Sequence, residues 1–168
     1  MGTIAEKTFT LTIIEHYFKL DEAADAEAID ELGKTNGVKS VNVGSITGKN
    51  DNAAKFGGDG YIDVDSDALY ASDEFTISAW INWDGSSGVN AIVGNDISGD
   101  AQSRGIIFFV DGSNGVLRTN SNVCAVVGSK DKPVTANAWH HVAFVKGNGN
   151  AQVYLDGELI GSDDVQFG

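Results

Sequence analysis

From residue 38 onward the chain consists of short β-prone runs separated by turn-forming residues, and this pattern restricts its fold more than any other feature. The runs are GYIDVDSD, FTISAWINW, AIVGND, GIIFFVDGSNGVLR, NVCAVVG, WHHVAFVKG and AQVYLDGELIG. The chain holds 21 glycines but only one proline, and glycine readily adopts the backbone conformations that tight turns need. The pattern predicts an all-β protein built from short antiparallel strands, as in sandwiches and barrels.

Two of these runs also predict their local structure. In FTISAWINW (75–83) every second residue is apolar, while Trp80 shares the opposite face with small polar residues. This alternation predicts a sandwich strand with its apolar face in the core. In YLDGELI the pair Asp156 and Gly157 separates two extended runs, which is the strongest short-range signal for a hairpin with a type I′ turn.

The N-terminal quarter gives less uniform signals. The segment KTFTLTIIEHYFKLDE (7–22) alternates apolar and polar residues and predicts one or two strands. The segment 21–34 is rich in Ala and Glu and places Gly33 where a helix C-cap would lie, so composition alone predicts a helix there.

Charge and length exclude several classes of protein. A formal net charge of −13 without a Lys/Arg cluster argues against nucleic acid and anionic membranes as partners. The 168 residues fit one domain, and no apolar run is long enough to insert into a membrane. Cys124 is the only cysteine, so no internal disulfide can form. Glu15, His16 and Lys19 interrupt the N-terminal apolar stretch, so we expect no signal peptide in this chain.

Four stretches, in this order, resemble the laminin-G-like or concanavalin A-like lectin-glucanase family. They are HYFKLDE (16–22), AAKFGGDGYIDV (53–64), DEFTISAWIN (73–82) and WHHVAFVKGNGNAQVYLDGELIG (139–161). The resemblance implies a two-sheet antiparallel jelly-roll sandwich over residues 15–168, preceded by a β arm at 1–14. It also implies an irregular loop with at most one short helical turn at 21–34. We adopt the loop, because tertiary context overrides weak helix propensity.

The chain departs from the family pattern in two places. Phe56-Gly57-Gly58 stands where the family usually has Phe, then Asp or Asn, then Gly. The sequence also stops at Gly168, where the family continues with a final strand that usually pairs near the first. We therefore expect either a fragment, or a sheet edge covered by the N-terminal arm or by a neighbouring subunit in a homo-oligomer or larger assembly.

The adjacent His140 and His141 suggest a metal or catalytic centre, but neighbouring side chains on a strand point to opposite faces. We therefore predict a structural role for both. A glycoside hydrolase is the enzymatic alternative, because the resembled family includes glucanases with a Glu-x-Asp-x-x-Glu pattern. The chain lacks that pattern, and its nearest set, Asp63, Asp65 and Asp67, contains no glutamate. We predict that the chain is not an enzyme.

The loop GNDISGDAQSRG (94–105) offers a candidate calcium site. Its oxygen-bearing side chains include Asn95, Asp96, Asp100 and Gln102, and hard cations prefer such ligands. The resemblance to pentraxin-like members implies an acidic ligand near Asp100. Asp96 and Asp100 are therefore the predicted metal ligands, with calcium as the candidate cofactor.

Sugar binding on such folds uses aromatic platforms together with amide or carboxylate groups. The aromatic candidates are Trp83, Trp80, Tyr70 and Tyr61. Trp83 is preferred as the exposed platform, because it precedes the polar loop DGSSGVN. The predicted ligand-binding set is Trp83, Asp96, Asp100 and Gln102.

These features favour a non-enzymatic recognition or adhesion module that binds carbohydrate or a protein partner at an extracellular surface or on a virion. The alternative is a structural role, as a decoration, fibre or attachment protein of a virion or other surface assembly. A glycoside hydrolase ranks below both. The choice depends on resemblance more than on any residue constellation, because one fold supports many functions.

Overall fold

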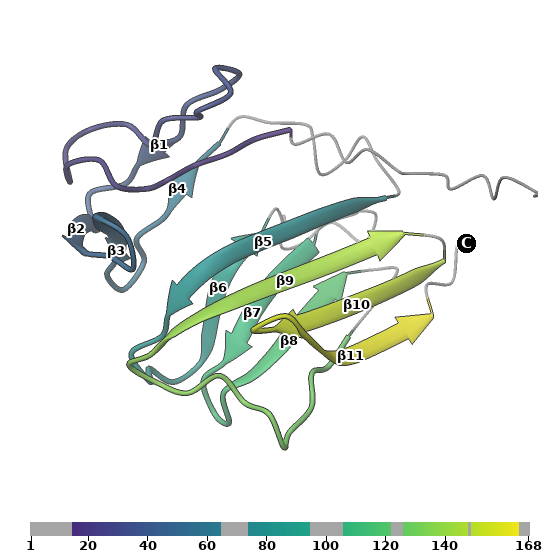
Figure 1. The fold of residues 1–168 in the computed structure, drawn as a ribbon. Helices are drawn as coiled ribbons and strands as arrows, with labels where there is room; N and C mark the ends of the chain where they lie inside the picture. Colours follow the sequence, from purple (N-terminus) through teal and green to yellow (C-terminus); the bar gives the residue numbers. More distant parts are fainter. Residues whose placement is uncertain (1–14, 65–73, 95–105, 122–125, 148, 165–168) are drawn as a thin grey trace, which may run out of the picture. The chain divides into compact units, whose positions relative to one another are not determined.

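A computed structural model describes residues 15–64, 74–94, 106–121, 126–147 and 149–164 of the chain (Figure 1). The chain forms two compact units, residues 1–66 and residues 67–168. Every regular element in the described ranges is a β-strand, and no helix occurs there, so none that could span a membrane. The all-β prediction is confirmed. The predicted arm at 1–14 lies outside the described residues.

The second unit is a sandwich of two antiparallel sheets (Figure 1). One sheet has the order β11-β10-β9-β5, with strands β5 (Phe75–Asn82), β9 (Trp139–Gly147), β10 (Asn150–Leu155) and β11 (Glu158–Asp164). The other has the order β6-β7-β8, with strands β6 (Val89–Gly94), β7 (Ile106–Asp111) and β8 (Val116–Ser121). Five of the seven predicted β-prone runs supply these strands. Of the sixth, 122–128, only residues 126–128 are described, and Val127 forms a bridge with Arg118 of β8. Part of the seventh, 60–67, forms β4 in the first unit.

The core of the second unit lies between its two sheets. Phe144 of β9 is fully buried, stacks at a tilt on Phe108 of β7 at 6.0 Å and meets Phe75 of β5 edge to face at 5.6 Å. Around these rings pack Ile106, Val110, Leu117, Val126, Val134, Val142, Ala151, Val153, Leu155 and Ile160. The apolar face of β5 packs against this cluster while Trp80 points away from it, as the alternation predicts.

The turn between β10 and β11 has the predicted hairpin geometry. Asp156 and Gly157 both have positive φ, 50° and 83°, as a type I′ turn requires. The Asp156 carboxylate accepts hydrogen bonds from the His141 backbone N–H at 2.9 Å and from the His140 imidazole Nδ1 at 2.8 Å. These bonds tie the turn to the start of β9 and offset the cost of positive φ at a non-glycine residue.

Replacing Gly157 with alanine is expected to destabilise the second unit by about 1 kcal/mol. An added Cβ there would meet nothing within 4 Å, so the cost comes from the left-handed backbone rather than from a clash. Gly147→Ala is the matched control, because its Cβ would make an ordinary 3.6 Å contact with Glu74 and its φ is not positive. Urea titration should show a lower midpoint for the first variant only; equal midpoints would contradict the strain argument.

The first unit contains two small antiparallel sheets. Strand β1 (Val38–Lys39) pairs with β4 (Ile62–Asp63), and β2 (Val43–Thr47) forms a hairpin with β3 (Asn52–Phe56). The β2–β3 hairpin was not among the predicted runs. Of the predicted N-terminal strand at 7–22, only residues 15–22 are described, and they contribute a single bridge, from Phe18 to Asp30.

Segment 21–34 is irregular, so the helix predicted from composition is wrong and the loop implied by the resemblance is confirmed. The reason is the buried carboxylate of Asp30, which accepts hydrogen bonds from three backbone N–H groups and one imidazole. The donors are Tyr17 N at 3.1 Å, Leu32 N at 3.1 Å, Thr35 N at 3.4 Å and His16 Nδ1 at 2.9 Å. The side chain of Asp30 thus binds the Leu32 N–H, which a helix would pair with a backbone carbonyl, and also holds Tyr17 and Thr35 from outside the segment. Gly33 closes a turn with φ +69°.

The same contacts make the first unit sensitive to acid. Burial alone would raise the pKa of Asp30, but the four hydrogen bonds outweigh it and hold the pKa far below its ordinary value. Because folding lowers this pKa, the unfolded chain binds the proton more tightly. The stabilisation is therefore complete above the ordinary aspartate pKa, about 3.9, and is lost as the pH falls toward the pKa of the folded state.

We expect hydrogen-exchange protection of the Tyr17 and Leu32 amides to fall between about pH 5 and pH 2. In Asp30→Asn protection should be weaker throughout and should depend less on pH, because the amide carries no titrating charge. Asp25→Asn, an exposed residue of the same loop, is the control and should keep the wild-type profile. Identical pH profiles for the wild type and Asp30→Asn would contradict this account.

Candidate functional site

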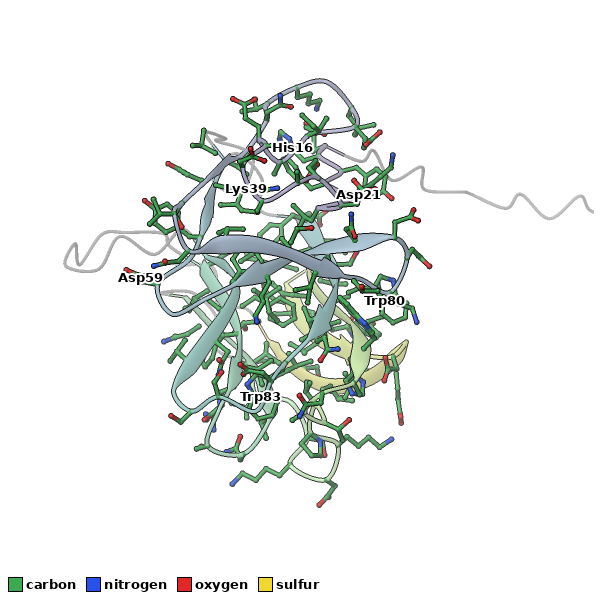
Figure 2. All side chains as sticks on the ribbon, turned by 90° about the vertical axis from the view of Figure 1, so that its left-hand side faces the viewer. His16, Asp21, Lys39, Asp59, Trp80 and Trp83 are labelled. Atoms are coloured by element: carbon green, nitrogen blue, oxygen red, sulfur yellow. The ribbon has the colours of Figure 1, made fainter. Side chains whose placement is uncertain are left out.

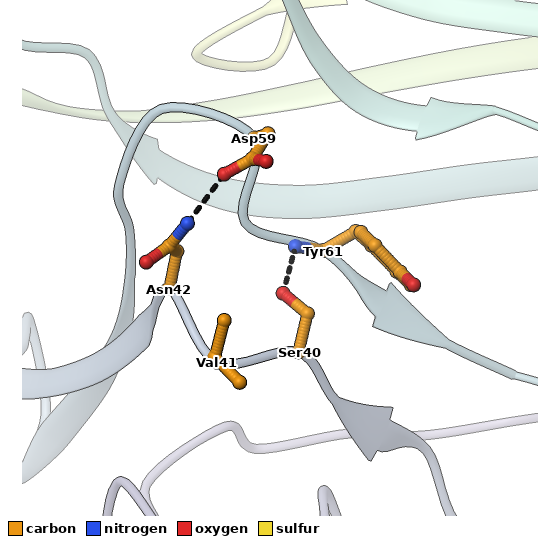
Figure 3. A pocket seen from close by; sticks show the side chains of 5 residues that line it. All are labelled: Ser40, Val41, Asn42, Asp59 and Tyr61. Atoms are coloured by element: carbon orange, nitrogen blue, oxygen red, sulfur yellow. Dashed lines mark hydrogen bonds between the residues drawn. The ribbon is translucent and has the colours of Figure 1, made fainter.

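Two connections of the first unit run side by side and line an open surface hollow of about 340 Å³ (Figure 3). One joins β1 to β2 and supplies Ser40, Val41 and Asn42; the other joins β3 to β4 and supplies Asp59 and Tyr61. We call this the Tyr61 hollow. Its volume lies at the lower end of the range of small-ligand sites.

Backbone hydrogen bonds fix the two connections against each other. Ser40 N–H donates to the Tyr61 carbonyl at 2.9 Å, and Tyr61 N–H donates back to Ser40 Oγ at 2.9 Å. Gly57 N–H donates to the Asn42 carbonyl at 2.9 Å. A Cβ on Gly60 would lie 2.6 Å from that same carbonyl oxygen, so the close approach requires glycine there. The hollow is therefore a preformed feature of the backbone.

The side chains around this hollow combine an aromatic ring with an amide–carboxylate pair. Asn42 and Asp59 point toward each other, and Asn42 Nδ2 donates to Asp59 Oδ1 (Figure 3). An amide and a carboxylate each have further hydrogen-bonding capacity, so this one bond leaves groups that can bind a ligand. Tyr61 is 60% exposed and Val41 is 99% exposed, which provides apolar surface beside the polar pair.

A second hollow, of about 470 Å³, adjoins the first at Ser40 and Val41. Its remaining lining residues are Ala24, Asp25, Ala26, Glu27, Val38, Lys39 and Val43. We call this the Lys39 hollow. The Lys39 ammonium donates to the Ala23 carbonyl at 3.0 Å and lies 3.5 Å from Glu22 Oε2, and its side chain is only 5% exposed.

The two adjacent histidines face opposite sides of β9, as predicted. His141 pairs in register with Trp80, and their rings meet edge to face at 5.3 Å on the outer face of the sheet. His140 pairs with Ile81 on the core side. In the described part of the chain, no group of three or more His, Cys, Asp or Glu side chains could hold a metal ion.

His140 links two neighbours that sequence analysis did not connect. Its Nδ1 bonds Asp156 Oδ2 at 2.8 Å, and its Nε2 bonds Thr135 Oγ1 at 2.8 Å. Burial alone would raise the pKa of Asp156, but its bonds with His140 and the His141 N–H lower that pKa below its ordinary value. A hydroxyl, an imidazole and a carboxylate bonded in this order also occur in hydrolase triads. Here the three side chains join the loop before β9, the start of β9 and the β10–β11 turn.

Trp83 was predicted to be an exposed platform, but the structure places its ring in a less exposed position. That ring is partly buried, packs against the core, and donates from Nε1 to the Ser86 carbonyl at 3.2 Å. Trp80 lies within β5 and is 48% exposed, so it is the more exposed of the two. Both side chains are labelled in Figure 2. Asp63 is exposed on β4. The other candidates, Asp65, Asp67, Tyr70, Asn95, Asp96, Asp100, Gln102 and Cys124, lie outside the described residues.

The family model described as the concanavalin A-like lectin/glucanases superfamily matches residues 56–168. The chain belongs to this superfamily. The resemblance inferred from the sequence is thereby confirmed over residues 56–168, which contain two of the four stretches in full and part of a third. The all-β sandwich fold class is confirmed with it. The match includes Asp59 and Tyr61 of the Tyr61 hollow.

One solved structure shares the fold across most of the chain. It is domain 4 of AbnA, a GH43 extracellular arabinanase from Geobacillus stearothermophilus, in complex with arabinotriose. The TM-score is 0.67 at 22% identity, over 91% of this chain and 75% of that one. No curated protein matches the chain. At this level of identity the likeness shows the fold.

Proposed function

We propose that the chain is a non-enzymatic carbohydrate-binding module and that the Tyr61 hollow holds the sugar. The observation that carries this proposal is the placement of one exposed aromatic ring beside an amide–carboxylate pair on two mutually fixed connections. Membership of a lectin and glucanase superfamily supports it, as does the similarity to a domain whose structure contains arabinotriose.

The chemistry of the hollow suits a sugar ring. Sugar hydroxyl groups both donate and accept hydrogen bonds, and the Asn42 amide and the Asp59 carboxylate offer partners of both kinds. The C–H surface of a sugar ring is apolar and can pack on the exposed face of Tyr61. Because hydrogen bonds already fix the backbone of the two connections, little backbone conformational entropy is lost on binding.

A glycan array followed by calorimetry tests the proposal. We expect the intact chain to bind a defined set of oligosaccharides and Asn42→Ala to bind them at least about fivefold more weakly, since a hydrogen bond contributes about 1 kcal/mol. Asn50→Ala, an exposed asparagine of the β2–β3 turn, is the matched control and should bind as the wild type does. Equal affinity for both variants would place the sugar elsewhere.

The other sequence-based functions remain predictions that the same samples can test. An array without specific binding, together with assembly that grows with protein concentration, would favour the structural role at a virion or other surface. Release of reducing sugar from β-glucans would favour the hydrolase. A melting temperature that rises with millimolar calcium would support the calcium site at Asp96 and Asp100.

A further inference from the structure

We propose that this site selects uncharged oligosaccharides, bound along the Tyr61 and Lys39 hollows, and rejects glycans that carry carboxylates. The inference rests on the proposed function. It follows from the distribution of charge around the two hollows, which adjoin at Ser40 and Val41 and so offer room for more than one sugar unit.

Carboxylates outnumber cations among the residues that line the two hollows. Asp59 lies in the first hollow, and Asp25 and Glu27 lie in the second. The single lining cation is Lys39. Of the three carboxylates, Asp59 and Glu27 each accept a hydrogen bond from a neutral asparagine, which leaves their negative charge in place.

Lys39 does not compensate this negative charge for a ligand. Its side chain is only 5% exposed, and its ammonium is already engaged by the Ala23 carbonyl and the Glu22 carboxylate. A uronate would therefore meet carboxylates without an available cation, and the net charge of −13 adds to the repulsion at longer range. An uncharged sugar is not repelled by these charges, and its hydroxyl groups can donate hydrogen bonds to the same carboxylates.

The expected selectivity depends on salt. Like charges about 4 Å apart near a protein surface repel by enough to weaken binding at least about tenfold. Added salt progressively screens this repulsion, because the Debye length falls from about 10 Å at 0.1 M to about 3 Å at 1 M. Affinity for uncharged oligosaccharides should not change with salt. The affinity for uronates should rise with it.

The test is calorimetry on the full chain with arabinotriose, cellotriose and galactotriose as uncharged probes and with trigalacturonate and the C6-oxidised form of cellotriose as charged probes. We expect binding of at least one uncharged probe, with the charged probes at least about tenfold weaker at low salt. Uronates that bind as tightly as uncharged sugars would overturn this inference and leave the proposed function intact. If no glycan binds, the proposed function itself fails.

A double variant tests which carboxylates cause the selectivity. In Asp25→Asn/Glu27→Gln we expect the ratio of uncharged to charged affinity to fall several-fold. The control Asp131→Asn/Asp163→Asn makes the same change in net charge at exposed positions that do not line either hollow, and its ratio should match the wild type. If the two double variants shift the ratio equally, the total charge of the protein rather than the carboxylates of the two hollows determines selectivity, and the inference is overturned.

Discussion

Replacing Phe144 with alanine is expected to lower the free energy of unfolding of the second unit by about 3–5 kcal/mol. This side chain is fully buried and contacts Phe75 from its own sheet and Phe108 from the opposite sheet. Its removal leaves a cavity where the two sheets meet, and close-packed interiors relax only partly around such a cavity. Chemical denaturation followed by tryptophan fluorescence measures the loss, because all three tryptophans lie in this unit.

Thr76→Ala is the control for this substitution. Thr76 lies in β5, next to Phe75, but on the exposed face of the sheet. Its replacement should change stability by less than about 0.5 kcal/mol. A Phe144→Ala protein that unfolds within about 1 kcal/mol of the wild type, roughly the cost of a surface change, would show that the two sheets do not share this core.

Replacing Tyr61 with alanine is expected to weaken glycan binding at least about tenfold, which corresponds to about 1.4 kcal/mol. The ring is the one aromatic group that lines the Tyr61 hollow. Its exposed face is the surface on which a sugar ring can pack. Because the side chain is more than half exposed and its backbone N–H and carbonyl provide the hydrogen bonds of the loop, the substitution should leave folding intact.

Tyr17→Ala provides the matched control, since Tyr17 is a half-exposed tyrosine of the same unit that lines neither hollow. Calorimetry with the strongest glycan from the array should give wild-type affinity for Tyr17→Ala and the reduced affinity for Tyr61→Ala. Both melting temperatures should stay near that of the wild type. Equal affinities for the two variants would remove Tyr61 from the proposed site.

The features that could be predicted from the sequence are those that depend only on residues close together along the chain. Alternation in 75–83 assigns the two faces of β5 because the side-chain period of a strand is two. The hairpin at Asp156-Gly157 was predictable because only a few residue pairs tolerate positive φ at both positions. The same period of two places His140 and His141 on opposite faces of β9.

Features that depend on contacts between distant segments were not predictable. Nothing in the sequence indicates that residues 40–42 and 59–61 lie side by side, and the Tyr61 hollow exists only through that contact. Likewise, helix propensity at 21–34 gave the wrong result because Asp30 accepts bonds from Tyr17 and Leu32, on both sides of it along the chain. Trp83 was predicted to be exposed but is partly buried, because a residue that directly follows a strand can turn toward the core or toward solvent, and neighbours from other segments decide which.

The order of strands in the larger sheet has a consequence for how the second unit assembles. Strands β9, β10 and β11 follow one another along the chain and form a meander in which each neighbour needs only a short turn. Strand β5 pairs with β9, and residues 83–138 separate the two strands along the chain. The entropy cost of bringing such distant segments together must be met before this pairing stabilises the sheet. The β5–β9 pairing, and not the hairpin, therefore contributes most of the contact order that slows folding of this sheet.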